Sequence, residues 1–371
     1  MSQDPGLLER VCSEAEQQLA KQVKDSPAVL RSFLTSLGQL QLHQPRLLER
    51  LLERYQTRLE AGERPNTKEV LAIVLTCATL NHRPSQPDLL QRLTAGLERG
   101  SGGLTDPVWL DLVWSLALLG QASPAHFQSV LCPAFAARLT DGAATLSVGP
   151  ALKLLNVNAA ARLLTPDYPG PLLSLEEEPQ LRAVAALPSL AKAQFSTSLL
   201  EALNTLAPPP RLSRAAVNTG LGCSLEAELV CDSGGRTLAV ADYSEERGKP
   251  LPAGAVRVAL MTASYQDCLV GGDLAGLTQF NRKLVEAAGY RVLLVRHTEW
   301  QQAADLPARQ DLYLVSDLRT PTLRLALLTG PVKAVQQTTP IIVGLSGRPG
   351  IFICIQTIQY SNKKMISVWW Q

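Results

Sequence analysis

Apolar residues recur at helical spacing three times in the first third of the chain, at offsets of 40 and 39 residues. In each copy a small residue, Gly38, Ala78 or Ala117, stands where two helices can approach closely, and a second apolar run follows after a turn. Two helices in a repeat of this length are typical of an α-solenoid, in which each unit buries its apolar face on its neighbours. We therefore predict a helical repeat array over residues 1–164.

The turns of the first two units contain His43 and His82 at matching positions, each two residues before a proline. We interpret both as turn residues rather than as ligands of a metal ion. The 7 cysteines lie far apart and form no C-x-x-C pair, which argues against a disulfide scaffold or a zinc site and is typical of core thiols in a reducing compartment. We expect no metal site and no other cofactor.

Prolines break the helical pattern between residues 165 and 180, where three consecutive acids also occur. Such a stretch cannot form the interior of a helix, so the array ends here. Residues 181–206 regain a helical pattern, which the prolines at 208–210 stop. We assign residues 165–222 to this proline-rich crossing and the helix that follows it.

Beyond residue 222 the apolar period changes from 3.6 to two, which indicates strands. Residues 225–231 alternate between apolar and polar, residues 232–235 contain the glycines of a turn, and residues 237–243 return as the second strand of a hairpin. Residues 256–263 form a third predicted strand.

An amphipathic helix is predicted over residues 274–288, with Asp273 as its cap and Gly289 as its end. Its apolar positions are Leu274, Leu277, Phe280, Leu284, Val285 and Ala288. Residues 290–295 are too few for a helix and apolar on both faces, which suits a buried parallel strand. The order of helix, three strands, helix and strand is that of the restriction-endonuclease-like fold, with a right-handed crossover through the second helix. We therefore predict an α plus α/β protein, in which the α-solenoid precedes a small endonuclease-like α/β region over residues 223–318.

Composition supports a folded protein with more than one domain, because 46% of the 371 residues are hydrophobic and only 18% are charged. The net charge is only +2, so any contact with nucleic acid must come from local patches rather than from bulk charge. No uncharged apolar run reaches 18 residues, so we expect no membrane span.

Three stretches of the chain resemble one family. Residues 284–300, a helix end followed by Ala-Gly-Tyr, a Val/Leu strand and Glu-Trp, resemble the RAP domain that closes the FAST kinase domain-containing proteins of mitochondria. Residues 67–135 resemble the family's first FAST region, and residues 156–173, with their Tyr-Pro-Gly-Pro-Leu-Leu step, resemble the start of its second. The resemblance implies a RAP domain over about residues 256–318 and an RNA-binding protein of the mitochondrial matrix.

Both ends of the chain depart from the family's pattern. Family members begin with an arginine-rich presequence and further helical repeats, whereas residues 1–16 are acidic, so we expect that this chain lacks the family's start. At the other end, Pro321 interrupts the helix with which RAP domains close, and residues 319–371 show no amphipathic period. We expect this tail to be poorly ordered.

The endonuclease-like fold raises the question of a metal-dependent active site. Nucleases of this fold hold a divalent metal on acids of two neighbouring strands, with a lysine nearby. The acidic positions available here are Glu226, Glu228 and Asp242, but Met261 and Ala263 stand where intact RAP domains carry acids, and no lysine follows. The glycine-rich loop and catalytic motifs of protein kinases are also missing from the sequence. We therefore expect vestigial acids and no enzymatic activity.

A cluster of cations and aromatic residues is the remaining candidate site. Arginines that meet phosphates beside rings that stack on bases are the combination used in binding single-stranded RNA. The predicted RNA-binding residues are Arg282, Lys283, Tyr290, Arg291, Arg296, His297 and Trp300. Resemblance to the family favours a non-catalytic protein that binds single-stranded mitochondrial RNA and influences its stability or processing, with other RNA-processing proteins as further partners. A metal-dependent ribonuclease and a protein-binding helical scaffold are the alternatives.

Overall fold

The computed structural model describes most of the chain between residues 27 and 302 and two strands near its end. The described ranges are residues 27–63, 65–97, 103–139, 146–174, 190–234, 236–243, 249–302, 353–360 and 363–370, with single positions at 10, 13, 14, 17, 181 and 184. The chain divides into two compact units, residues 1–327 and residues 328–371.

In the second unit, strands β6 (Ile353–Tyr360) and β7 (Lys363–Trp370) pair antiparallel. They lie within the tail for which the sequence predicts poor order. The other residues of that tail, and residues 303–318 of the predicted RAP domain, lie outside the described residues.

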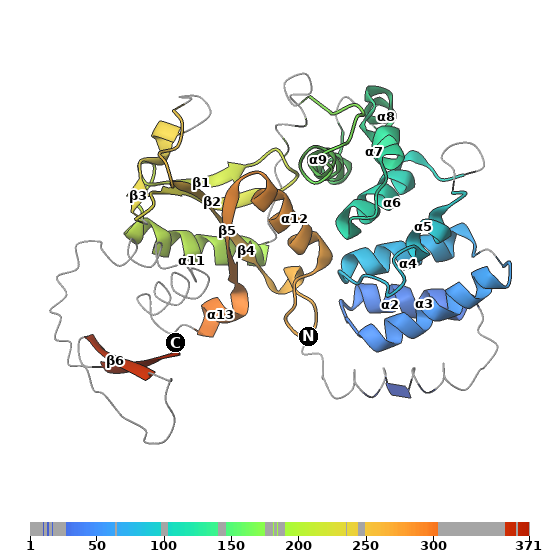
Figure 1. Ribbon diagram of the computed structural model, residues 1–371, viewed down its shortest axis with the longest axis horizontal. Coiled ribbons are helices and arrows are strands. Elements are labelled where there is room, and N and C mark those ends of the chain that lie inside the picture. Colours follow the sequence, from blue (N-terminus) through green and yellow to red (C-terminus); the bar gives the residue numbers. More distant parts are fainter. Residues whose placement is uncertain are drawn as a thin grey trace. The chain divides into compact units, whose positions relative to one another are not determined.

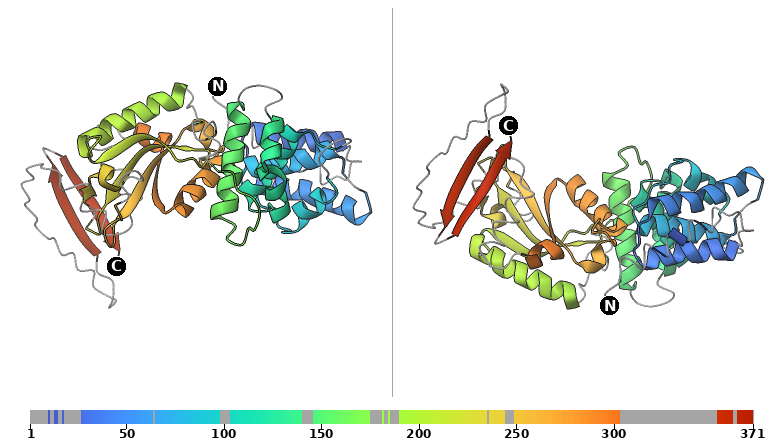
Figure 2. Two further views of the ribbon diagram at one scale, coloured as in Figure 1. Left: turned by 90° about the horizontal axis from the view of Figure 1, so that it is seen from above. Right: turned by 90° about the horizontal axis from the view of Figure 1, so that it is seen from below.

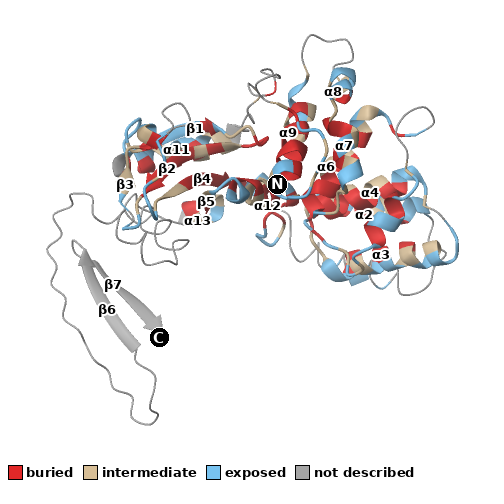
Figure 3. Cartoon of the chain, turned by 45° about the horizontal axis from the view of Figure 1, so that its top comes forward, coloured by how far each residue is buried: buried red, intermediate tan, exposed pale blue. Residues whose placement is uncertain are grey.

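The first unit begins with a stack of helices (Figure 1). They are α2 (Pro27–Gln39), α3 (Pro45–Glu60), α4 (Thr67–Thr79), α5 (Leu89–Thr94), α6 (Asp106–Leu119), α7 (Pro124–Leu131), α8 (Pro133–Leu139) and α9 (Val148–Leu163). The first helices of the three predicted repeats pack in sequence, with α2 against α4 and α4 against α6, and α6 also contacts α9. Gly38 permits one of these close approaches, because a Cβ atom there would lie 3.3 Å from Oγ1 of Thr76. Figure 3 shows the buried positions along these helices.

Histidines join the turns of the first two repeats. Nε2 of His43 lies 3.2 Å from Nδ1 of His82, whose own Nε2 lies 2.8 Å from Oε1 of Glu49. Burial lowers the pKa of both imidazoles. The tautomer of each ring decides which of the two imidazoles donates across the 3.2 Å contact, and the Glu49 carboxylate lies beside Nε2 of His82. The two histidines are therefore turn residues that fix neighbouring repeats to each other.

A mixed sheet with helices on both faces follows the stack. Its elements are α11 (Leu190–Leu206), β1 (Ser213–Asn218), β2 (Ser224–Cys231), β3 (Thr237–Leu238), η1 (Val240–Tyr243), β4 (Val256–Ala263), η2 (Tyr265–Asp267), α12 (Gly276–Ala287), β5 (Tyr290–Arg296) and α13 (His297–Gln302). The strand order is β1-β2-β4-β5, and β3 pairs with the end of β2. The parallel pairing of β4 with β5 confirms the prediction for residues 290–295. The combination of helices with a small mixed sheet confirms the α plus α/β class.

The prediction of a second hairpin strand over residues 237–243 is wrong for most of those residues. Only Thr237 and Leu238 pair with β2, and Val240–Tyr243 is a 3-10 turn. The reason is competition for an edge of β2, because β1 pairs with residues 224–229 and leaves only Val230 and Cys231 for β3. The strand β1 was not predicted from the sequence.

The predicted start and buried face of α12 also need correction. Asp273 does not cap the helix, because Leu274 forms a bridge with Cys268 and Ala275 takes the cap position. Leu277 is 39% exposed, and Ala288 is exposed as well. The buried positions are Gly276, Thr278, Phe280, Leu284 and Val285. The buried surface is displaced because α12 contacts the helices α4, α6 and α9 as well as β5.

Helices lie on both faces of the sheet (Figure 2), and the two faces have separate hydrophobic cores. On one face, Leu229, Leu260 and Val295 pack with α11 and with Trp300 of α13. On the other face, apolar residues of β4 and β5 join Phe280 of α12 in a core that is continuous with that of the helical stack. The helix α12 therefore lies between the sheet and the stack.

Candidate nucleic-acid interface

The carboxyl ends of β4 and β5 lie side by side, since Ala263 at the end of β4 is in register with Arg296 at the end of β5. The strand β4 continues into the 3-10 turn η2, and β5 continues directly into α13. In α/β sheets, ligands bind outside the carboxyl ends of parallel strands, because the loops that follow the strands converge there. This edge of the sheet is therefore the first place to look for a site.

An exposed aromatic ring stands at this edge. Tyr265 is 62% exposed, and its ring meets that of His297 edge-on, with 5.9 Å between the centroids. Arg296 lies close enough to Cys268 that its charge opposes the rise in the pKa of that thiol, which burial causes. We call Tyr265, Arg296 and His297 the carboxyl-end cluster. It brings together two of the predicted residues and adds Tyr265, which the sequence analysis missed.

The turn that presents Tyr265 is held in place by Asp267. Oδ2 of Asp267 accepts hydrogen bonds from the backbone N of Ser264 at 2.8 Å and from its Oγ at 2.6 Å. Nζ of Lys192 on α11 lies 3.3 Å from the same oxygen. The Ser-x-x-Asp spacing directly after a strand is a capping signal, and it could have indicated a short fixed turn with an outward tyrosine.

Trp300 does not belong to the interface. Its side chain is only 5% exposed, and it packs in the core between α11 and the sheet. Its Nε1 donates to Oγ of Ser198 at 3.2 Å, and its ring lies 6.3 Å from that of Phe195. The indole cannot stack on a base without leaving this core, so the prediction for Trp300 is wrong.

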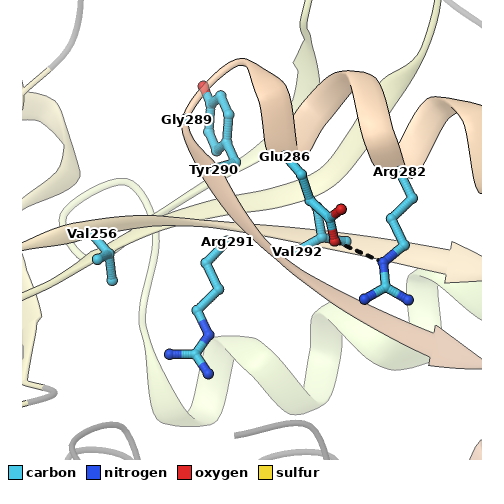
Figure 4. Close-up of a pocket in the computed structure, with 7 residues that line it drawn as sticks. All are labelled: Val256, Arg282, Glu286, Gly289, Tyr290, Arg291 and Val292. Atoms are coloured by element: carbon cyan, nitrogen blue, oxygen red, sulfur yellow. Dashed lines mark hydrogen bonds and ion pairs between the residues drawn. The ribbon is translucent and has the colours of Figure 1, made fainter. Parts of the chain in front are cut away.

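A pocket of about 520 Å³ lies at the other end of β5 (Figure 4). Its lining residues are Val256, Arg282, Glu286, Gly289, Tyr290, Arg291 and Val292. Nε of Arg282 lies 2.8 Å from Oε1 of Glu286, one helical turn away. Figure 4 shows Arg291 extending away from Tyr290, as successive residues of a strand do. We call this the β5 amino-end pocket, and it contains three of the predicted residues.

Glu228 fixes the tyrosine of this pocket. The carboxylate is completely buried and lies 2.5 Å from Nη2 of Arg214 and 2.6 Å from Nη1 of Arg257. The Tyr290 hydroxyl donates to it at 3.3 Å, and burial together with the negative charge of Glu228 raises the pKa of Tyr290. The positive charges of two arginines therefore neutralise Glu228.

The other two predicted acids occupy different surroundings. Glu226 accepts a hydrogen bond from Oγ1 of Thr262 at 2.5 Å. Asp242 lies on the 3-10 turn η1 and not on a strand. In the part of the chain that the structure describes, no three His, Cys, Asp or Glu side chains are grouped to hold a metal ion.

Lys283 is separated from Arg282 although the two are neighbours in sequence. Burial lowers the pKa of Lys283, and the positive charge of Arg83, in the turn after α4, lowers it further. The predicted residues therefore fall into three places: the β5 amino-end pocket, the carboxyl-end cluster and the contact between α12 and the helical stack. The pocket and the cluster stand at opposite ends of a seven-residue strand, about 20 Å apart.

Two subdomain models of one family match the chain. The model described as FAST kinase-like protein, subdomain 1, matches residues 70–140, and the one described as FAST kinase-like protein, subdomain 2, matches residues 151–239. Individual proteins of the same family are also similar to this chain in sequence. FAST kinase domain-containing protein 4 of Homo sapiens is 31% identical over 240 residues, which is 62% of this chain and 37% of the relative. The protein of the same name from Rattus norvegicus is 29% identical over 253 residues, which is 65% of this chain and 39% of the relative.

The chain belongs to the FAST kinase-like family. This confirms the family resemblance and its two FAST regions, whereas the RAP domain over about residues 256–318 stays a prediction. The chain spans less than two fifths of the length of these family members, since the matches cover 37% and 39% of them. The two FAST kinase-like subdomain matches stop at residue 239, before β4 begins. The candidate interface on β4, α12 and β5 therefore lies outside the residues that the two subdomain models match.

Among the described residues, no helix has the length and apolar content needed to cross a bilayer.

Proposed function

We propose that this FAST kinase-like chain is a non-catalytic protein of the mitochondrial matrix that binds single-stranded RNA and influences the stability or processing of mitochondrial transcripts. The compartment and the class of RNA rest on the family resemblance. The binding surface rests on the carboxyl-end cluster, where an exposed Tyr265 stands beside His297 and Arg296 at the end of two parallel strands. That cluster is the observation that carries the proposal.

The chemistry of the cluster fits unpaired bases. An exposed ring held on a fixed turn offers a face on which a base can stack, and stacking is worth about 1–3 kcal/mol per base. Duplex nucleic acid keeps its bases stacked on one another, so such a ring selects single strands. The guanidinium of Arg296 supplies a positive charge for the adjacent phosphate.

The β5 amino-end pocket extends the proposed surface along the edge strand. Its lining carries the cations Arg282 and Arg291, the acid Glu286 that pairs with Arg282, and Tyr290, which extends away from Arg291. In this proposal the helical repeats act as an α-solenoid that holds the same strand of RNA, and other RNA-processing proteins bind to the assembly.

The metal-dependent ribonuclease is the less favoured alternative. An active site of that kind needs acids that are available to a divalent cation. Glu228, the acid at the centre of the sheet, is instead bound by two arginines, whose positive charges would also repel the metal. No feature of the described residues favours the scaffold alternative over RNA binding.

The proposal is tested with the purified full chain and three fluorescent ligands: a single-stranded oligoribonucleotide, duplex DNA of the same length and an acidic polysaccharide. We expect the tightest binding for single-stranded RNA, with log affinity falling by about 0.7 per phosphate contact for each tenfold rise in salt. Equal affinity for the polysaccharide would contradict the proposal, because stacking would then contribute nothing. Cleavage of the RNA on addition of Mg²⁺ or Mn²⁺, lost in Glu226→Gln, would support the ribonuclease.

A further inference from the structure

The β5 amino-end pocket lies at an edge of the sheet. Among the described strands the order is β1-β2-β4-β5, so β5 is an edge strand, and residues 289–292 line the pocket where that strand begins. Arg282 and Glu286 line it from the last turns of α12. Its volume of about 520 Å³ falls within the range of about 300–1,000 Å³ that is usual for ligand sites. The pocket therefore has the size of a binding site.

Two guanidinium groups and one carboxylate line this pocket. Nε of Arg282 pairs with Oε1 of Glu286 at 2.8 Å, which leaves the two terminal nitrogens of Arg282 as donors. Arg291 makes no ion pair in the described part of the chain. In Figure 4 the side chains of Arg282 and Arg291 extend in the same direction. The lining therefore combines one excess positive charge with a set of N–H donors.

The tyrosine of the pocket is held on the other face of β5. Its hydroxyl donates to Oε1 of Glu228 at 3.3 Å, and that carboxylate is completely buried. Tyr290 is in register with Arg257, which pairs with the same carboxylate. Arg291 is in register with Val258, which packs with α11. Tyr290 therefore points away from the cations, and the lining offers a ligand charge rather than a ring for stacking.

We propose that this pocket holds one phosphodiester group of a single-stranded RNA between Arg282 and Arg291, and that the RNA runs along β5 to the carboxyl-end cluster. A phosphodiester carries one negative charge, which matches the one excess positive charge of the lining. Guanidinium groups match phosphate oxygens with paired N–H donors. Such a contact positions the strand without reading its bases, and Tyr265 supplies the stacking. The inference rests on the proposed function for the identity of its ligand.

The spacing of the two sites predicts the length of RNA that they share. The pocket and the carboxyl-end cluster stand about 20 Å apart, at opposite ends of β5. Stacked nucleotides of one strand rise about 3.4 Å each, so about six of them reach from one site to the other. A dinucleotide occupies only one of the sites. We therefore expect affinity to rise steeply between a dinucleotide and a hexanucleotide.

The test uses the purified full chain and three probes: a single-stranded oligoribonucleotide, an abasic oligomer of the same length that keeps the phosphodiesters without the bases, and polyglutamate. The variants are Arg282→Gln, Arg291→Gln and the two together. Arg211→Gln is the matched control, because Arg211 is exposed just before β1, at the opposite edge of the sheet. Calorimetry measures binding, and thermal unfolding checks that each variant is folded.

We expect the abasic oligomer to bind the unchanged chain and Arg211→Gln alike. The double variant should bind it about 10- to 150-fold more weakly, as for lost hydrogen bonds to a charged group. The slope of log affinity against log salt should become shallower by about 0.7, the value for one phosphate, rather than by about 1.4, the value for two.

Glu286→Gln tests the pocket without removing an arginine. Glu286 is exposed, so its replacement should leave the fold unchanged. Its carboxylate repels a phosphate in the pocket, and we expect Glu286→Gln to bind the abasic oligomer about 2- to 5-fold more tightly. An unchanged or weaker affinity in this variant would overturn the pocket as a phosphodiester site.

The outcomes separate the pocket from the proposed function. If abasic binding is lost in the double variant while RNA binds the unchanged chain no more tightly than the abasic oligomer does, the phosphodiester site stands and the stacking function is rejected. If the double variant binds both nucleic-acid probes like the unchanged chain, the site is overturned, even where Tyr265→Ala weakens RNA binding. Polyglutamate that binds as tightly as the abasic oligomer, and is lost in the double variant, also overturns it, because the ligand is then an acidic peptide.

Discussion

At the scale of single residues, Glu228 shows how a position suited to catalysis can serve the structure instead. Its carboxylate is fully buried beneath Arg214, Arg257 and Tyr290, which come from three other strands. A carboxylate in an interior persists only where partners compensate for its lost hydration. The sequence shows an acid on a strand, but Arg214 and Arg257 lie 14 and 29 residues away, and their convergence is set by the strand registers.

Replacement of this carboxylate tests its role. Glu228→Gln removes the negative charge and leaves two arginines facing each other, so we expect a loss of about 3–5 kcal/mol in the free energy of unfolding, as for a broken buried ion pair. Glu226→Gln is the matched control on the same strand. It affects only one hydrogen bond, with Thr262, so we expect a loss of about 1 kcal/mol in the free energy of unfolding. Chemical denaturation measures both. Equal stability of the two variants would show that the arginines do not depend on Glu228.

At the scale of elements, α12 connects the sheet to the helical stack. Its Gly276 touches α4, and its Asn281 accepts a hydrogen bond at 3.2 Å from Asn156 of α9. Asn156 also donates to the carbonyl of Leu221 at 2.7 Å and accepts from Nε1 of Trp114 at 3.0 Å. One buried amide thus binds two helices of the stack, the turn before β2 and α12.

The glycine at the start of α12 provides a direct test of this packing. Gly276→Ala places a methyl group against the carbonyl of Ala78, so we expect a loss of about 1–3 kcal/mol in the free energy of unfolding, typical of overpacking. In Gly149→Ala, on α9, the added methyl has nothing within 4 Å. That control should be neutral or stabilised by up to about 1 kcal/mol, because alanine favours helix. Thermal unfolding that ranks the two variants in the opposite order would refute this contact.

The elements also show which predictions a local pattern can support. The helix α12 and the strand β5 could be predicted from the sequence, because the apolar spacing and the turn residues that mark them lie within or beside the elements themselves. The strand β1 has only Ser213 and Val217 buried, so no alternating apolar pattern marks it, and it exists through its pairing with β2. The predicted strand through residue 243 stopped early for the same reason, since β1 had taken the available edge.

At the scale of the whole molecule, residues close in sequence separate and distant ones meet. Arg282 and Lys283 serve the pocket and the stack contact respectively, and Trp300 turns into the core beside α11. Tyr265 lies outside the stretch from which the binding residues were predicted, yet it completes the carboxyl-end cluster. Composition and periodicity could predict that the chain carries cations and rings, but only the strand registers and helix contacts determine which of them share a surface.

The most direct measurement of the RNA-binding account is the affinity of Tyr265 variants for single-stranded RNA. Because Tyr265 is 62% exposed, its replacement should leave thermal unfolding unchanged. If Tyr265 stacks on one base, we expect Tyr265→Ala to bind single-stranded RNA about 5- to 150-fold more weakly. Tyr265→Phe keeps the ring and should bind the RNA like the unchanged chain. A Tyr265→Ala chain that binds RNA with unchanged affinity would contradict the claim that the carboxyl-end cluster is the RNA interface.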